Sequence, residues 1–311
     1  MPSTRSKLIN FMLRNRHFLH LRLKPDTIDE HTSIPQFRAE AERMSRAMAK
    51  LPEDIELQPT TIDGMTAEWI YPTNASPEKV ILYTHGGGYI SGSCTDHRAI
   101  VSKMVKSCGV KTLQFDYRLA PEHPFPAALD DSVKAYCWLL AEGYLPENIV
   151  IMGESAGGGL CLALLLAIRD QNLPLPAAGV ALSAWTDLKC TGESYETKAK
   201  LCLSPMGSWT VFSSYYVGDN DPGNPGISPL YADLHGLPPL LIITGDDEVL
   251  RDDSIRFAEK AQQTGVDATL RVSEGMVHCY PLMAPMFPEA TAAMSEISTF
   301  INTHLYKTNS K

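Results

Sequence analysis

The sequence predicts an α/β fold with a mostly parallel central sheet, helices on both faces and a helical cap. Short apolar runs alternate with helical patterns along most of the chain. Two segments of alternating apolar and polar residues precede them, and the interval 185–240 breaks the rhythm. The length of 311 residues is compatible with one large domain.

The apolar runs are expected to be buried strands, because continuous apolar strands separated by helices are typical of a parallel sheet covered on both faces. We expect these strands at 79–84, 110–116, 149–152, 177–182, 240–244 and 268–272. The helical patterns cover 97–107, 127–140, 156–169, 252–263 and 288–304. Segments 55–62 and 65–71 flank Asp63-Gly64, a strong hairpin signal.

Composition excludes several classes of function. The formal net charge of −9 leaves no basic surface for a nucleic-acid backbone. Seven scattered cysteines without a CxxC pair indicate free thiols in a reducing compartment. Apolar runs stay shorter than the ~18 residues of a membrane span, and Arg14 and Arg16 interrupt any signal-peptide core. We therefore expect a soluble, cytoplasmic chain.

The motif Gly-Glu-Ser-Ala-Gly places Ser155 between the strand 149–152 and the helix 156–169. This strand–turn–helix context is the one that a nucleophile elbow requires. Glycines at 153 and 157 avoid collisions at the sharp turn, and the amides at the helix start favour developing negative charge. A dinucleotide site is excluded, because its G-x-G-x-x-G pattern would need glycine in place of Ser155.

A second glycine-rich segment, His-Gly-Gly-Gly at 85–88, follows the strand 79–84. Loops of this kind supply backbone N–H groups to an oxyanion, and glycine lets the backbone approach the substrate. We expect the oxyanion hole to consist of the amides of Gly87, Gly88 and Ala156, and Tyr89 to line the substrate pocket.

Several blocks together resemble the hormone-sensitive-lipase-like family of α/β-hydrolase esterases, over about residues 55–305. The blocks are HGGGYIS at 85–91, DYRLAPEHPFPAALDD at 116–131, GESAGG at 153–158, SPLYADL at 228–234 and GMVHC at 275–279. The resemblance implies an α/β-hydrolase fold and a Ser-acid-His triad. Most members carry Asp where this chain has Glu154, a change that keeps the charge.

The other triad members are expected after the last strands, in the order Ser, acid, His. His278 stands where the family carries its base. For the acid, many relatives read D-P-L-x-D-[DE], and aligning the trailing Asp252-Asp253 places their first Asp on Glu248. We choose Glu248, with Asp246 and Asp247 as alternatives. Asp252 is expected to be a helix N-cap or a loop anchor.

The domain boundaries follow from this assignment. We expect an N-terminal helical cap segment at 1–50, a catalytic domain at 51–305 with a cap insertion at about 185–225, and a polar tail at 306–311. The first segment is basic and amphipathic; packing over the body is preferred here to binding at a membrane surface.

No metal is expected, because Asp96 and His97 have no third ligand with metal-like spacing and Asp96 is better explained as a helix cap.

The expected function is a serine carboxylesterase that hydrolyses short- to medium-chain acyl esters through an acyl-enzyme, with no cofactor. The alternatives are an amidase or peptidase that uses the same triad, and a non-catalytic ligand receptor. The presence of both Ser155 and His278 argues against a receptor. The resemblance also implies a homodimer through the sheet edge near the last strand.

Overall fold

The computed structural model describes residues 1–15, 28–48 and 51–306. Within these residues, eight strands form one sheet in the order β1-β2-β4-β3-β5-β6-β7-β8. They are β1 Ile55–Ile62, β2 Met65–Pro72, β3 Val80–Thr84, β4 Lys111–Phe115, β5 Ile149–Glu154, β6 Ala178–Leu182, β7 Leu240–Gly245 and β8 Ala268–Ser273. Strands β3 to β8 run parallel, while β1 and β2 are antiparallel to their neighbours. The predicted mostly parallel sheet is confirmed.

The hairpin expected at Asp63-Gly64 is present between β1 and β2. Asp63 has φ 48° and Gly64 has φ 87°, and positive φ at both central residues is what a type I′ hairpin turn requires. Ile62 pairs with Met65 directly across the turn. The local sequence therefore sets the register of this edge of the sheet.

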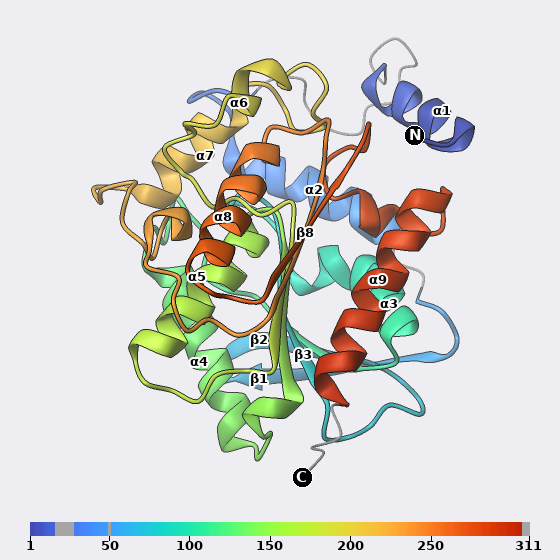
Figure 1. The fold of residues 1–311 in the computed structure, drawn as a ribbon, viewed down its shortest axis with the longest axis vertical. Coiled ribbons are helices and arrows are strands. Elements are labelled where there is room, and N and C mark those ends of the chain that lie inside the picture. Colours follow the sequence, from blue (N-terminus) through green and yellow to red (C-terminus); the bar gives the residue numbers. More distant parts are fainter. Residues whose placement is uncertain (16–27, 49–50, 307–311) are drawn as a thin grey trace.

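Helices cover both faces of the sheet (Figure 1). α3 Cys94–Cys108 and α9 Pro288–Leu305 lie on one face, and α4 Ala127–Ala141, α5 Ala156–Asp170 and α8 Arg251–Gln263 on the other. Successive side chains of a strand point to opposite faces. In β3, Val80 and Leu82 pack under the second group of helices, while Ile81 and Tyr83 pack under the first.

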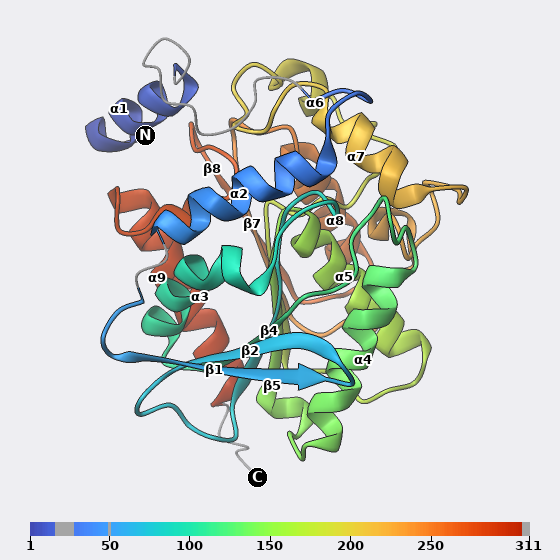
Figure 2. The same ribbon diagram turned by 180° about the vertical axis from the view of Figure 1, so that it is seen from behind.

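The loops that follow the parallel strands meet at one end of the sheet, where α1 Thr4–Arg14, α6 Ser194–Thr197 and α7 Ser208–Val217 also gather (Figures 1 and 2). α2 Ile34–Met48 lies beside α3 below them. Polar atoms carried by these loops therefore meet at this end. Within the described part of the chain, no helix is both long enough and apolar enough to cross a bilayer.

Most boundaries match the expected ranges within a few residues, but α3 begins earlier than expected. Its N-cap is Ser93, whose hydroxyl accepts a hydrogen bond from the Asp96 amide at 3.1 Å. Asp96 lies in the first turn, so its expected role as the cap is wrong. A serine is a preferred N-cap, and the sequence shows two competing capping residues close together. The expected polar tail at 306–311 lies almost entirely outside the described residues.

The centre of the sheet should dominate the stability of the fold. Ile151, in the middle of β5, is fully buried, so Ile151→Ala should lower the free energy of unfolding by about 2–5 kcal/mol. Leu145→Ala is the control, because this side chain is 55% exposed and should change stability by only ~0.5 kcal/mol. Urea denaturation measures both, and equal losses would contradict the assignment of the core.

Candidate active site

Ser155 lies between the last residue of β5 and the first residue of α5. Its backbone has φ 56° and ψ −123°, a conformation that costs a non-glycine residue free energy and that clusters at functional sites. The Ser155 amide donates to the Leu182 carbonyl at 2.8 Å, and the Ser155 carbonyl accepts from the Trp185 amide at 3.0 Å. These bonds to the last residue of β6 and to the segment after it hold the turn, so the strained backbone geometry expected from the motif is present.

The turn leaves no room for a side chain at Gly157. A Cβ there would lie 2.1 Å from the Thr84 carbonyl oxygen and 2.3 Å from that of His85. Both are backbone atoms of the segment that leads into the glycine-rich loop. The elbow and this loop therefore approach each other because position 157 carries only hydrogen.

The loop at 86–88 has the backbone conformation that its glycines suggested. Gly87 has φ 121°, and a Cβ there would lie 2.1 Å from the Ser91 carbonyl oxygen. Gly88 has φ 67°. Ala156, the third expected oxyanion donor, is the first residue of α5. Both glycines thus hold positive φ values, which residues with a side chain rarely adopt.

Glu154 fixes the glycine-rich loop, which the sequence did not reveal. Its carboxylate accepts from the Gly86 amide at 2.6 Å and from the Tyr83 hydroxyl. The His97 imidazole lies 3.0 Å from the same carboxylate. Burial by itself lowers the pKa of His97, but the Glu154 charge and hydrogen bond raise it above its ordinary value. The only signal in the sequence is the acidic residue inside G-x-S-x-G.

His85, the first residue of the glycine-rich motif, has a structural environment. Its ring stacks on Tyr117 at 4.1 Å between centroids and on His97 at 5.1 Å. Burial and the nearby His97 lower the pKa of His85 to about 3, so the ring is neutral. Nδ1 lies 2.8 Å from the Gly86 carbonyl oxygen and therefore carries the proton that it donates. His85 helps to shape the loop and does not act as a base.

The structure brings Glu248 to His278. His278 Nδ1 lies 2.5 Å from Glu248 Oε2. The Glu248 side chain is fully buried, and its Oε1 accepts from the Ser183 and Thr244 hydroxyls at 2.7 Å each and from the Gly245 amide at 2.6 Å. Charge-assisted bonds of this kind stabilise a buried carboxylate. The alternatives, Asp246 and Asp247, pair instead with cations outside this pocket.

Ser183 joins the three loops that carry Ser155, Glu248 and His278. It follows Leu182, which binds the Ser155 amide. Its hydroxyl donates to Glu248 and accepts from the Cys279 amide at 2.9 Å. No recognisable motif marks Ser183, so sequence reasoning missed it.

Aromatic residues of α7 face the site. The Trp209 ring meets the His278 ring edge to face, with centroids 5.9 Å apart. A Cβ on Gly88 would lie 2.3 Å from Phe212, so this ring packs against the glycine-rich loop. Tyr89, expected to line the substrate pocket, is buried and stacks on Tyr216 with centroids 3.7 Å apart.

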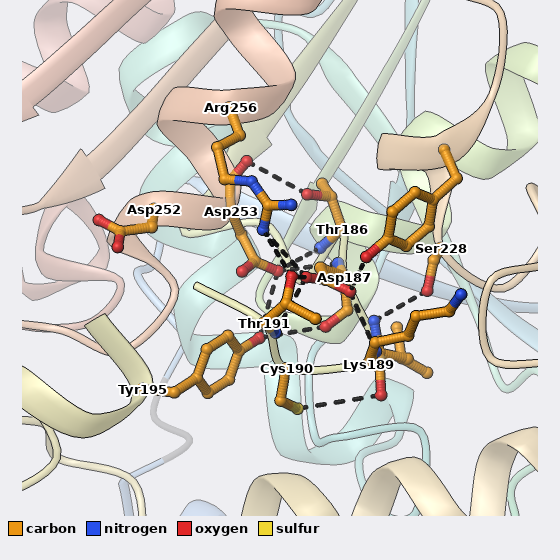
Figure 3. Close-up of polar contacts among 12 residues, drawn as sticks. Thr186, Asp187, Lys189, Cys190, Thr191, Tyr195, Ser228, Asp252, Asp253 and Arg256 are labelled. Atoms are coloured by element: carbon orange, nitrogen blue, oxygen red, sulfur yellow. Dashed lines mark hydrogen bonds and ion pairs between the residues drawn. The ribbon is translucent and has the colours of Figure 1, made fainter. Parts of the chain in front are cut away.

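A buried acidic network ties the segment after β6 to α8 (Figure 3). Asp253 accepts from the amides of Thr186 and Asp187 at 2.9 and 2.8 Å, and Asp187 pairs with Arg256 at 3.0 Å. Burial and the nearby Asp187 charge raise the pKa of Asp253 well above its ordinary value. Asp252 accepts from the Ser194 amide at 2.9 Å, while Leu250 occupies the N-cap position. Of its two expected roles, Asp252 is thus a loop anchor.

Among the described residues, no cluster of His, Cys, Asp and Glu side chains has the arrangement of a metal site. His97 contacts Glu154 and stacks on His85. Cys279 has φ 54° and follows His278 directly. Burial raises the pKa of the Cys279 thiol, although His278 opposes this effect. A protonated thiol is a weak nucleophile, so nothing in this environment favours Cys279 over Ser155, the nucleophile that the sequence predicts.

Gly157→Ala should displace the elbow, because the new methyl group would collide with two backbone carbonyls. We expect a loss of about 1–3 kcal/mol in the free energy of unfolding, together with loss of the esterase activity that the sequence predicts. Gly223→Ala is the matched control, since the nearest atom to its Cβ is the flexible Nζ of Lys189. Thermal melting and p-nitrophenyl acetate hydrolysis provide the readouts. Equal behaviour of the two variants would contradict the close approach described above.

Comparison with known proteins agrees with this geometry. A family model described as an alpha/beta hydrolase fold matches residues 81–282. An acetyl-hydrolase of Streptomyces hygroscopicus is 39% identical over 244 residues, which cover 78% of this chain and 81% of the relative. An esterase of Acinetobacter venetianus is 36% identical over 248 residues, with 79% and 82% covered. This chain is also similar to the crystal structure of an esterase from the bacterial hormone-sensitive lipase family. The two sequences are 40% identical, the match covers 98% of this chain and 99% of the other, and the TM-score is 0.88. The chain belongs to the hormone-sensitive-lipase-like family of α/β-hydrolase esterases.

Proposed function

We propose that this chain is a serine carboxylesterase with Ser155 as nucleophile, His278 as general base and Glu248 as the acid that orients the imidazole. The single observation that carries the proposal is the His278–Glu248 hydrogen bond, which is tied through Ser183 to the strained turn at Ser155. These elements lie at the ends of adjacent parallel strands, where such folds bind their substrates.

The reaction proceeds in two halves. Ser155 Oγ attacks the ester carbonyl carbon while His278 Nε2 takes the hydroxyl proton. His278 then gives this proton to the alkoxy oxygen of the leaving alcohol as the bond between that oxygen and the carbonyl carbon breaks. In the second half, His278 takes a proton from a water molecule as that water attacks the acyl carbon. The proton then passes to Ser155 Oγ, so the carboxylic acid is released and Ser155 is restored.

The oxyanion of each tetrahedral intermediate is stabilised by the amides of Gly87, Gly88 and Ala156. Support comes from Glu154, which holds the loop at the Gly86 amide, and from the close approach of the loop to Gly157. Donors fixed before the reaction cost no reorganisation when the charge develops, and each is worth about 10²–10³-fold in rate.

The substrates we infer are esters with short to medium acyl chains. The relatives include acetyl-hydrolases and carboxylesterases, and the rings of Trp209 and Phe212 limit the space beside His278 and Gly88. We also propose that segment 1–50 and the insertion at about 185–225 form a cap over this space. The described helices of both segments lie near the loop end of the sheet.

We further infer a cytoplasmic location and a homodimer. Free cysteines at all seven positions suit a reducing compartment. Strand β8 lies at the sheet edge and Val272 on it is 40% exposed, so this edge is open to a second copy.

Ser155→Ala should lower kcat for p-nitrophenyl butyrate by about 10⁴-fold or more, because it removes the hydroxyl on which the proposed acyl-enzyme forms. A fluorophosphonate should label the wild type once per chain and leave the variant unlabelled. Anilides of the same acyl length, assayed in parallel, distinguish an amidase. Near-wild-type turnover in the variant would defeat the proposal.

The pH profile should report His278, which accepts a proton only when it is neutral. Burial lowers the pKa of His278, but the Glu248 carboxylate opposes this effect, and the pKa lies above its ordinary value of 6.5. kcat/KM should therefore fall as pH falls through this pKa and still be rising above pH 6.5.

Glu248→Gln removes a charge that raises this pKa, so the midpoint should move to lower pH and the plateau should drop about 10⁴-fold. Measurements of kcat/KM from pH 5 to 9 on both proteins test this. A wild-type midpoint below 6.5, or an unmoved midpoint in the variant, would contradict the assignment of the acid and the base.

A further inference from the structure

We propose that helix α1 braces the two loops that carry the catalytic acid and base, with Arg14 and Asn10 as positioning residues. The loops are the acid loop, residues 246–250, and the base loop, residues 274–279. This inference rests on the proposed function. It extends that function to a helix that lies more than 200 residues from both loops in the sequence.

α1 contacts both loops. The Arg14 guanidinium pairs with the Asp247 carboxylate, which is adjacent to Glu248. The Asn10 side-chain amide donates to the Gly275 carbonyl at 2.8 Å, three residues before His278. The two loops are themselves joined where α1 meets them, since the Asp247 amide donates to the Met276 carbonyl at 2.9 Å. One helix thus binds the acid loop and the base loop at their junction.

The residues that make these contacts are buried or partly buried, which strengthens the contacts. Asn10 is only 3% exposed, and the Arg14 and Asp247 side chains are 26% and 13% exposed. Charge-assisted hydrogen bonds in such partly buried positions are stronger than ion pairs on an open surface. The Asp247 carboxylate is also held from its other oxygen by Lys198 at 3.2 Å, so it is fixed between α1 and the segment that follows α6.

The other end of α1 is anchored to the body of the protein. Ser3, its N-cap, donates from its hydroxyl to Glu289 of α9 at 2.9 Å, and the Ser6 hydroxyl donates to the same carboxylate at 3.2 Å. The residue before the cap touches the base loop as well: a Cβ on Gly275 would lie 2.9 Å from Pro2. A helix fixed at its start holds Asn10 and Arg14 in place against the two loops.

The proposed effect is on the chemical step and not on substrate binding. The His278–Glu248 bond joins one residue from each loop, so relative movement of the loops changes the position of the imidazole. Misplacement by about 1 Å can cost about 10²-fold in rate. Arg14 and Asn10 bind Asp247 and Gly275 and not the catalytic pair itself, so their loss should lower kcat and leave KM unchanged.

The experiment compares Arg14→Ala, Arg14→Lys and Asn10→Ala with Arg5→Ala in the full chain. Arg5 lies on the same helix and is exposed, so it controls for loss of a charge from α1. We expect kcat for p-nitrophenyl acetate to fall about tenfold in Arg14→Ala and Asn10→Ala, with KM within about twofold. Arg14→Lys should recover most of the loss, and Arg5→Ala should match the wild type. Fluorophosphonate titration counts the folded sites in each preparation.

A double-mutant cycle isolates the Arg14–Asp247 pair. Asp247→Ala should cost less in the Arg14→Ala background than in the wild type, because the same interaction is already lost. Unchanged kcat in both Arg14→Ala and Asn10→Ala, a rise in KM alone, or equal losses in Arg5→Ala would overturn the brace. If Arg14→Ala does not fold, Asn10→Ala and Arg14→Lys take its place. The brace then predicts a lower kcat in Asn10→Ala, a kcat close to the wild-type value in Arg14→Lys, and a KM within about twofold of the wild type in both.

These experiments distinguish failure of the brace from failure of the proposed function. A wild type whose hydrolysis does not depend on Ser155 would remove the catalytic assignment, whereas a fully active wild type with unaffected Arg14 and Asn10 variants would remove only the brace.

Discussion

The structure around the candidate site depends on one buried carboxylate, Glu248. Its charge is removed from water and is stabilised by two hydroxyls, one backbone amide and the His278 imidazole. A buried charge without such partners would cost several kcal/mol. The need to satisfy Glu248 therefore fixes Ser183 after β6, Thr244 at the end of β7 and His278 after β8 relative to one another.

A second buried carboxylate, Glu154, organises the opposite side of the site. It holds the Gly86 amide and the Tyr83 hydroxyl, and the His97 imidazole lies beside it. Glu248 holds the His278 imidazole, the proposed base, whereas Glu154 holds the loop proposed to supply the oxyanion donors. The two carboxylates thus fix the two segments to which the proposed base and oxyanion donors belong. Gly157 allows the two sides to approach, because any side chain there would meet backbone carbonyls.

Much of this architecture could be predicted from the sequence, and the parts that could not have a common cause. Alternation of apolar runs and helices predicted the sheet, since strand burial leaves a local pattern. The motifs predicted the strained turn at Ser155. Ser183, Glu154 and His97 were missed as supports, because their roles arise from contacts between distant segments that no local pattern records. Asp96 was assigned wrongly because Ser93 supplied a competing cap only three residues earlier.

In the proposed mechanism, the turn at Ser155, the glycine-rich loop and the Glu248–His278 pair act as one catalytic unit. A crystal structure of the enzyme after reaction with a fluorophosphonate tests it most directly. We expect phosphorus bonded to Ser155 Oγ, a phosphoryl oxygen about 2.7–3.1 Å from the amides of Gly87, Gly88 and Ala156, and His278 still bound to Glu248. An adduct on another residue, or a phosphoryl oxygen directed away from these amides, would contradict it.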